Sequence, residues 1–516
     1  MAGMKPVLSF SVFVTLAALP VWAATPAHSC PDLAKGIFGA DVTIESARVV
    51  AAAANLPAHC EIRGVIWPEA RFVAKLPQDW NERFQMVGNG GWAGAISVSA
   101  EDAAVRLGYA SISTDTGHDA QKEPGAIFAL KSPTNPHAER KVIDHGYLAV
   151  HETALLGKKL VRAYYGADAK YSYWVGCSTG GRQGLMEAER YPEDFDGYVI
   201  GAPVLNLSGL QMKAIWNWIA VGPGAGEIKA EKMQALADAV YNKCDASDGM
   251  GSGGVKDGLI ESPLGCGFDP AKDLKKCAGA EAVDCFTSAQ IAALNKVYDG
   301  VRNSKGELLF PGMPVGGEVF APARGQGGTS VMKSGWDGSM LNSFQLGDTY
   351  MKFMAFDDPR GAGWDYRTYN FDADPAKMAN SALRINATIP DLTAVKMRGA
   401  KIVHYHGWAD PGVTAKMSVD YYTAATKIMG EKETRDFYRF FPVAGMFHCG
   451  GGPGCGNADW LSAVRDWVEN GKAPDMIVGA RADGLRKRPI CAWPTAAKYK
   501  GSGSLDEADS FRCEAR

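Results

Sequence analysis

A serine between glycines is the first residue in this chain whose type and setting could do chemistry. Ser178 is the centre of Gly-Cys-Ser-Thr-Gly, residues 176–180, which has the form Gly-x-Ser-x-Gly. The segment 171–175 before it is typical of a strand, and 181–190 after it is typical of a helix. In that setting the pattern holds a nucleophilic serine on a sharp strand-to-helix turn, where glycines avoid collisions with the neighbouring elements. A glycine-rich turn that merely contains a serine is the alternative interpretation.

The base and the acid that such a serine needs follow it in the chain. A serine hydroxyl is a weak nucleophile until an oriented base removes its proton. Asp410 follows the predicted strand 401–405, and His448 follows the predicted strand 437–443, which gives the order of α/β hydrolases. We therefore predict a triad of Ser178, Asp410 and His448, with a structural loop histidine as the alternative for His448. Two of the nine histidines lie in or beside a strand and are expected to be packed or to support the site: His404 and His406.

A glycine-rich segment after an early strand could bind the oxyanion of an acyl-transfer reaction. Residues 87–94 read Val-Gly-Asn-Gly-Gly-Trp-Ala-Gly and follow the predicted strand 84–87. Small residues let the backbone approach a substrate carbonyl, so we predict the amides of Gly91 and Thr179 as the two donors. The segment lacks the Lys-Ser/Thr ending of a phosphate-binding loop and the Gly-x-Gly-x-x-Gly spacing of a dinucleotide site. Acyl transfer is therefore favoured.

Alternating strands and helices are expected to position these residues. Short apolar runs alternate with helical spacing, which predicts an α/β fold with a mostly parallel sheet. The predicted strands are 71–76, 84–87, 110–113, 171–175, 197–200, 401–405 and 437–443, and the predicted helices are 144–165 and 181–190. Residues 206–395 show little strand alternation, so we predict a large lid domain inserted between two late strands. The catalytic domain is then 25–205 and 396–516, and its tail from about residue 480 is expected to be loop-like.

The amino-terminal residues predict the compartment. Residues 1–24 contain a charged Lys5, an apolar stretch and a Val-Trp-Ala ending, which is typical of a cleaved signal peptide. The apolar stretch is shorter than the roughly 20 residues that a membrane span needs, which argues against an anchor. No later segment is apolar for long enough to span a membrane. We therefore expect a soluble mature protein, secreted or periplasmic, in which cysteines form disulfides.

Charge and composition exclude two classes of partner. The chain has 516 residues, with 54 Lys and Arg against 57 Asp and Glu and a formal net charge of −3. This balance argues against nucleic acid or an anionic membrane surface as the main partner. A hydrophobic content of 46% with 22% charged residues is typical of a globular protein rather than a disordered one.

Two of the 11 cysteines flank the predicted chemistry. Cys177 precedes Ser178, and Cys449 follows His448. Hydrogen bonding between the serine and the histidine would bring the two cysteines close together. We therefore predict a Cys177–Cys449 disulfide that ties the nucleophile loop to the base loop. An odd number of cysteines leaves at least one without a partner inside the chain.

Together these motifs resemble the tannase and feruloyl esterase family. They are Gly-Cys-Ser-x-Gly-Gly at 176–181, the aspartate of His-Gly-x-x-Asp at 406–410, and His-Cys-x-Gly-Gly-Pro-Gly at 448–454. The adjacent Cys-Ser and His-Cys pairs are not general features of α/β hydrolases, so the resemblance is specific. It covers nearly the whole mature chain and is weakest in 206–395. It implies an α/β-hydrolase fold and the triad and disulfide predicted above.

The resemblance also implies the remaining disulfides. They are Cys30–Cys60, Cys244–Cys266, Cys277–Cys285 and Cys491–Cys513. These pairs and Cys177–Cys449 account for every cysteine except Cys455, which is expected to be a thiol in the glycine-rich loop after the catalytic histidine.

An acidic, glycine-rich stretch at 244–260 predicts a structural calcium site. Hard oxygen ligands on a tight loop suit Ca²⁺, although the spacing of an EF-hand is not met. In the family the corresponding loop is continuous and remote from the triad, whereas residues 250–254 look inserted here. The resemblance implies the side chains of Asp245, Asp248 and Asp257 and the carbonyls of Val255 and Leu259 as ligands. A solvated acidic turn is the alternative.

The predicted lid is expected to line the acyl pocket, and the resemblance implies that Leu207 faces the acyl group. Six aromatic residues are candidates for a pocket wall, although most of them are expected simply to pack in the core: Trp216, Trp218, Trp336, Phe344, Tyr350 and Phe353. The serine-rich, arginine-bearing lid features with which terephthalate-monoester hydrolases of this family hold a free carboxylate have no evident counterpart around 346–359. Hydroxycinnamate or gallate esters are therefore favoured over terephthalate esters.

The resemblance thus implies a secreted serine carboxylesterase that hydrolyses esters of phenolic acids, hydroxycinnamic or gallic, through an acyl-enzyme. Small-molecule or polysaccharide-linked aromatic esters are the expected substrates, and the oligomeric state stays open. A terephthalate-monoester or broad aryl esterase is the alternative among enzymes. A catalytically silent, calcium-stabilised binding protein is the alternative outside them, and the complete triad argues against it.

Overall fold

The computed structural model describes residues 26–245, 256–324, 330–334, 336 and 338–515. The predicted signal peptide at 1–24 lies outside the described residues, as do two predicted calcium ligands, Asp248 and Val255. None of the described helices combines the length and the apolar character that a membrane span requires.

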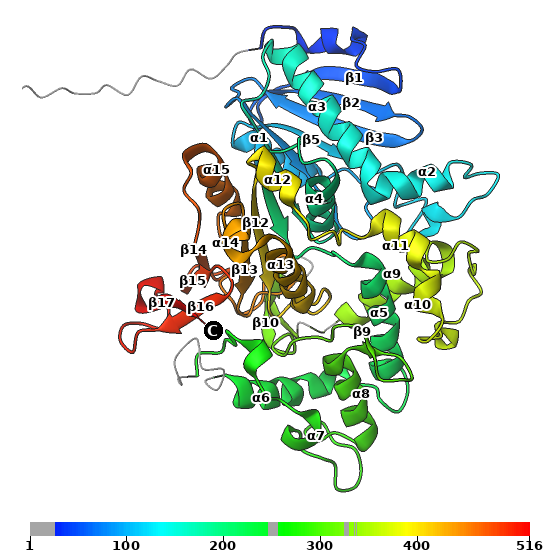
Figure 1. The fold of residues 1–516 in the computed structure, drawn as a ribbon, viewed down its shortest axis with the longest axis vertical. Helices are drawn as coiled ribbons and strands as arrows, with labels where there is room; N and C mark the ends of the chain where they lie inside the picture. Colours follow the sequence, from blue (N-terminus) through cyan, green and yellow to red (C-terminus); the bar gives the residue numbers. More distant parts are fainter. Residues whose placement is uncertain (1–25, 246–255, 325–329, 335, 337, 516) are drawn as a thin grey trace, which may run out of the picture.

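One mixed sheet organises the described chain, in the strand order β1-β2-β3-β5-β4-β6-β7-β12-β13 (Figure 1). The pairs from β1 to β5 are antiparallel, and the pairs from β5 to β13 are parallel. All the predicted strands are present, while β1 and β2 are additional; β1 is an edge strand without a fully buried residue. The strands are β1 (Val42–Val50), β2 (His59–Ile66), β3 (Ala70–Pro77), β4 (Arg83–Val87), β5 (Ala110–Thr114), β6 (Tyr171–Cys177), β7 (Gly197–Gly201), β12 (Lys401–Gly407) and β13 (Tyr438–Val443).

Helices cover both faces of this sheet. Neighbouring residues of β6, Tyr173 and Trp174, belong to different buried clusters, because successive side chains of a strand point to opposite faces. The cluster around Trp174 includes α3, α4 and α13, and the cluster around Tyr173 includes α1 and α15. These helices, with the short α14 that precedes β13, are α1 (Val98–Arg106), α3 (Ala149–Tyr165), α4 (Thr179–Arg190), α13 (Ala415–Met429), α14 (Glu431–Arg435) and α15 (Trp460–Asn470).

The predicted helix 144–165 is part of a longer helical segment. α2 (Ala138–Ile143) runs into α3 through one π-helical turn at Asp144–Leu148. The segment ends where Gly166 takes a left-handed conformation, with φ of 72°, that glycine adopts without strain. α3 and α4 pack on the same face of the sheet, with buried residues of β5 and β6 in the same cluster.

The described elements between β7 and β12 are mainly helices, with four short strands. β7 pairs directly with β12, so the chain leaves the sheet and returns to the neighbouring position, as predicted for an insertion. Its central part has a separate buried cluster, and α5 contributes its first turns to the main core and its last residues to this cluster. The elements are α5 (Leu207–Val221), α6 (Met233–Cys244), α7 (Pro270–Asp273), α8 (Ser288–Asp299), β8 (Val301–Arg302), β9 (Leu308–Phe310), β10 (Phe320–Arg324), β11 (Ser330–Ser334), α9 (Ser339–Phe353), α10 (Asp374–Lys377), α11 (Ala379–Ile385) and α12 (Thr393–Arg398). The domain boundaries at 206 and 395 stay a prediction.

The tail from residue 480 is not loop-like, so that prediction is wrong. It forms two antiparallel hairpins with β14 (Met476–Ala480), β15 (Lys487–Cys491), β16 (Thr495–Tyr499) and β17 (Phe511–Ala515). A small core of Cys491, Ala497 and Phe511 and the Cys491–Cys513 disulfide join the hairpins. Short strands with frequent charged residues give little alternation, which hides them in the sequence.

Candidate active site

Ser178 is the single residue between β6 and α4. Its φ of 64° and ψ of −124° lie outside the regions that a side-chain-bearing residue ordinarily adopts, so the turn is strained. A Cβ atom at Gly176 would lie 2.4 Å from the carbonyl oxygen of Gly180, which explains the first glycine of the motif. The sharp turn presents the serine at the carboxyl edge of the parallel strands.

Asp410 and His448 lie at the same edge, in the loops after β12 and β13. His448 Nδ1 is 2.6 Å from Asp410 Oδ2. The other carboxylate oxygen of Asp410 accepts hydrogen bonds from the amides of Gly412 and Val413 at 2.9 and 2.8 Å. His406 Nε2 lies 3.3 Å from Asp410 Oδ2. The predicted support of the site by a strand histidine is thus found at His406.

The electrostatics of this pair suit a general base. Burial alone would raise the pKa of Asp410, but His448 and His406 hold it well below its ordinary value, so the carboxylate is ionised. Burial alone would lower the pKa of His448, but the Asp410 charge and hydrogen bond produce a net rise. An aspartate in this position fixes the imidazole orientation and stabilises the imidazolium that forms when the base takes a proton.

A disulfide joins the serine loop to the histidine loop. Cys177 and Cys449 are bonded, with their Cα atoms 5.9 Å apart. Cys449 has a φ of 61°, so the residue after His448 is also in a left-handed conformation. Ser178 and His448 both line one cavity. The bond therefore limits how far the two side chains can separate.

The glycine-rich segment after β4 packs directly on the start of α4. A Cβ atom at Gly88 would lie 2.5 Å from Gly180 Cα, so only glycine allows this approach. The Gly180 amide donates to the Asn89 carbonyl at 2.8 Å. Asn89 and Gln183 exchange two further hydrogen bonds, at 3.0 and 2.9 Å. These contacts fix the segment relative to the serine.

The two predicted oxyanion donors border the cavity. Thr179 is the first residue of α4, where an amide has no acceptor within the helix. A Cβ atom at Gly91 would meet no atom within 4 Å, so this glycine faces open space. The Thr179 hydroxyl donates to the Gly91 carbonyl and holds the two residues together. Both residues line the same cavity as Ser178, and their role as oxyanion donors stays a prediction.

The cavity at Ser178 has a volume of about 400 Å³ and a largely apolar wall. Leu207 lines it, as the resemblance implies, together with Leu210 and Leu346 from α5 and α9. None of the six candidate aromatic residues lines it, which agrees with the expectation that most of them pack in the core. These rings instead pack between helices, as in the stack of Trp218 on Phe344 with centroids 4.9 Å apart. A larger cavity of about 580 Å³ lies elsewhere, between β3 and α2, and holds none of the triad.

Lys213 of α5 is a residue of the cavity that the sequence analysis does not identify. It is 2% exposed, and its Nζ donates to the Gly412 carbonyl at 2.9 Å. Burial lowers the pKa of the Lys213 ammonium to about 8, although Asp410 acts in the opposite direction. No motif or spacing marks this lysine, because α5 reaches the triad only in the folded chain.

All five predicted disulfides are present. They are Cys30–Cys60, Cys177–Cys449, Cys244–Cys266, Cys277–Cys285 and Cys491–Cys513. Cys455 is the remaining thiol, and burial raises its pKa to about 11. Burial thus disfavours the thiolate, which is the reactive form of this cysteine.

The described part of the predicted calcium stretch is an acidic turn. The Asp245 carboxylate accepts hydrogen bonds from the amides of Asp257 and Gly258, at 3.2 and 2.8 Å. Asp257 accepts a bond from the Leu259 amide at 3.0 Å and forms a buried ion pair with Arg488 at 2.9 Å. Carboxylate and carbonyl oxygens are the donors that Ca²⁺ prefers, so the donor type fits this ion.

Comparison with known proteins agrees with this geometry. Residues 56–514 match the model of the family described as tannase and feruloyl esterase. The chain is 31% identical to mono(2-hydroxyethyl) terephthalate hydrolase of Piscinibacter sakaiensis, over 91% of this chain and 87% of that protein. It is 30% identical to a probable feruloyl esterase B-2 of Aspergillus terreus, over 86% of this chain and 83% of that protein.

A solved structure shares the fold. The crystal structure of feruloyl esterase B from Aspergillus oryzae superposes with a TM-score of 0.83 at 25% identity, over 94% of this chain and 99% of that chain. The sheet order, the serine turn and these similarities identify the α/β-hydrolase fold that the sequence predicts. The chain therefore belongs to the tannase and feruloyl esterase family and is a carboxylic ester hydrolase.

Proposed function

We propose that this esterase hydrolyses esters of phenolic acids, hydroxycinnamic or gallic, through an acyl-enzyme formed on Ser178. The observation that carries the proposal is the hydrogen-bonded Asp410–His448 pair, whose histidine lines the same largely apolar cavity as Ser178. The feruloyl esterases among its relatives support the same class of substrate.

The proposed reaction follows from the roles that the site offers. Ser178 Oγ attacks the ester carbonyl carbon, and His448 takes the serine proton through the nitrogen that does not contact Asp410. The amides of Gly91 and Thr179 stabilise the negative oxygen of the tetrahedral intermediate. His448 then gives the proton to the leaving alcohol, which releases it and leaves the acyl group on Ser178. Water, activated by the same histidine, completes the hydrolysis.

The cavity wall supports an aromatic acyl group with polar substituents. Leu207, Leu210 and Leu346 offer apolar surface to a ring. Gln211 and Ser343 also line the cavity and can hydrogen-bond phenolic hydroxyls.

Lys213 favours a second candidate, an ester whose aromatic ring carries a free carboxylate. A buried ammonium in the cavity is a partner for such an anion, and the relative from Piscinibacter sakaiensis is named as a terephthalate-monoester hydrolase. Lys213 already donates to the Gly412 carbonyl, so we rank this substrate second.

Rates on matched substrates test the proposal. We expect the wild-type protein to hydrolyse methyl ferulate and methyl gallate faster than mono(2-hydroxyethyl) terephthalate. Ser178→Ala should reduce each rate by about 10⁴-fold or more while circular dichroism stays unchanged. Faster turnover of the terephthalate monoester would establish the second candidate, and undiminished rates in the serine variant would disprove the mechanism.

Secretion and calcium are further parts of the proposal. Residues 1–24 act as a cleaved signal peptide, and the five disulfides suit an oxidising compartment. A structural Ca²⁺ would be held by Asp245, Asp248, Val255, Asp257 and Leu259. Chelation should lower the melting temperature and Ca²⁺ should restore it, while a melting temperature insensitive to both would contradict the site. Amino-terminal sequencing of the exported protein tests the cleavage.

A further inference from the structure

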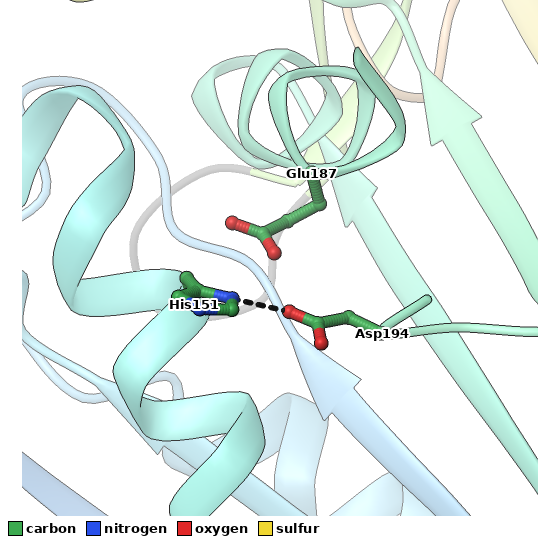
Figure 2. A group of neighbouring side chains, drawn as sticks. All are labelled: His151, Glu187 and Asp194. Carbon is green, nitrogen blue, oxygen red and sulfur yellow. Dashed lines mark hydrogen bonds and ion pairs between the residues drawn. The ribbon is translucent and has the colours of Figure 1, made fainter. Parts of the chain in front are cut away.

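Three side chains of types that bind metals lie close together between α3 and α4, away from the catalytic cavity. His151 comes from α3, Glu187 from α4, and Asp194 from the loop between α4 and β7. One ligand atom from each lies within 4.8 Å of the others. Figure 2 shows the three side chains pointing toward one another, with the His151–Asp194 contact of 2.7 Å drawn as a dashed line.

Glu187 is the unusual member of this cluster. It is 0% exposed, and neither of its carboxylate oxygens has a hydrogen-bond partner. Figure 2 shows its carboxylate directed toward His151 and Asp194. A buried carboxylate without hydrogen-bond donors destabilises the fold, because its loss of hydration is not compensated by protein hydrogen bonds. The neighbouring Asp194 carboxyl can share a proton with Glu187, whereas a bound cation would satisfy both carboxylates at once.

The surroundings leave excess negative charge for a cation to balance. Lys158 lies 4.0 Å from the Asp194 carboxylate and donates to the Asp194 carbonyl, so one positive charge faces two carboxylates. The Tyr198 hydroxyl is also buried without a hydrogen-bond partner. His151 stacks on Tyr191 with ring centroids 3.6 Å apart, which fixes the imidazole plane.

We propose that His151, Glu187 and Asp194 bind one divalent transition-metal cation of the zinc type. One imidazole nitrogen and two carboxylate oxygens match the ligands of Zn²⁺, whereas Ca²⁺ and Mg²⁺ prefer sets made only of oxygen. The His151 side chain is 20% exposed, which gives the cation a path from solvent and a position for water. Zinc replaces the contact between His151 and Asp194 and supplies the missing partner of Glu187.

The cation has a structural role, because the cluster lies away from the triad. Glu187 follows Ser178 along α4 by about 13 Å at the usual helical rise. The bound metal ties α3 and the loop before β7 to the helix that carries the nucleophile. This inference does not depend on the substrate proposed above.

Zinc uptake by the intact mature protein tests the site. The protein is stripped with a chelator, resupplied with Ca²⁺, incubated with excess Zn²⁺, desalted and analysed for bound metal. We expect one retained zinc per chain and a melting temperature several degrees higher than without zinc. Glu187→Gln and His151→Phe should each weaken zinc binding by roughly 100-fold or more. The phenylalanine keeps the stack on Tyr191 and lies at a partly exposed position, so at least this variant should fold.

Glu189→Gln is the matched control. Glu189 is a partly buried carboxylate of the same helix, and its Oε1 accepts hydrogen bonds from the Ile389 amide and the Tyr421 hydroxyl, both at 2.9 Å. This variant should retain zinc as the wild type does. No retained zinc in the wild type would overturn the proposal and assign Glu187 a proton in place of the metal. Equal retention in the wild type and both ligand variants would place the zinc elsewhere and overturn it as well.

Discussion

The molecule contains two histidine–aspartate pairs of nearly the same geometry in very different surroundings. His448 Nδ1 lies 2.6 Å from Asp410, and His151 Nδ1 lies 2.7 Å from Asp194. His448 of the first pair shares a cavity with Ser178, while the second pair lies between α3 and α4 and faces Glu187. A histidine–aspartate hydrogen bond by itself therefore does not define the chemistry of a site. The third group and its access to substrate decide between a catalytic base and a metal ligand.

The two aspartates also differ in how their charge is stabilised. Asp410 accepts two amide hydrogen bonds and contacts two histidines, so its ionised form is well supported. Asp194 lies beside Glu187, and Lys158 is a positive charge that acts on both carboxylates. The charge of Asp410 is thus stabilised by the protein alone, whereas a bound cation would stabilise the charges of Asp194 and Glu187.

The largest expected difference in kcat is between replacement of Asp410 and replacement of Asp194. Asp410→Asn should reduce kcat on methyl ferulate by about 10⁴-fold, because the imidazole loses its orienting charge. Asp194→Asn should reduce kcat by a few-fold at most and lower the melting temperature. Comparable losses of kcat in the two variants would contradict the separation of the catalytic pair from the structural one.

Removing the disulfide beside the triad should have the next largest effect. Cys177→Ala with Cys449→Ala is expected to lower kcat by about 10- to 100-fold, because small displacements of catalytic groups are costly. It should also reduce the free energy of unfolding by about 2–4 kcal/mol, since the bond closes a long loop. Removing Cys491–Cys513, which lies in the C-terminal hairpins, should destabilise the protein without lowering kcat at the temperature of the assay. Equal losses of kcat after removal of either disulfide would contradict a positioning role of Cys177–Cys449.

The lysines beside the two pairs should respond differently to the same change. Lys213→Met should lower turnover of a terephthalate monoester by about tenfold relative to methyl ferulate, because a buried charged hydrogen bond is lost. Lys158→Met should instead tighten zinc binding by a few-fold, since a positive charge near the cation disappears. Unchanged substrate preference in the first variant would remove Lys213 from substrate recognition.

The pH dependence of catalysis gives the smallest effect. His448 must be neutral to accept the serine proton, so kcat/KM should fall as pH drops through its pKa, which Asp410 holds above the ordinary value. Removing the Asp410 charge should shift the midpoint of this acid limb to lower pH, as measured on the residual activity of Asp410→Asn. A shift to higher pH would contradict the proposed electrostatics.

The sequence predicts the catalytic end of the molecule well for a physical reason. Parallel strands deliver their carboxyl ends to one edge, so Ser178, Asp410 and His448 could be brought together from strand assignment and chain order alone. The disulfides other than Cys177–Cys449 came from the resemblance. The strands of the carboxyl-terminal tail were missed because they are short and charged.

The features that the sequence could not predict depend on tertiary packing. Lys213 and the group of His151, Glu187 and Asp194 come from elements with no shared motif, so no spacing connects them. The candidate aromatic residues lie outside the cavity because α5 and α9 direct leucines such as Leu210 and Leu346 toward it and stack Trp218 on Phe344.

Covalent labelling is the most direct test that Ser178 is the activated nucleophile. The mature protein is treated with a fluorophosphonate, and intact and peptide mass spectrometry locate the adduct. We predict one adduct per chain on Ser178, formed in step with loss of methyl ferulate hydrolysis and strongly slowed in Asp410→Asn. An active protein that stays unlabelled at Ser178, or that is labelled and inactivated at another residue, would contradict the account.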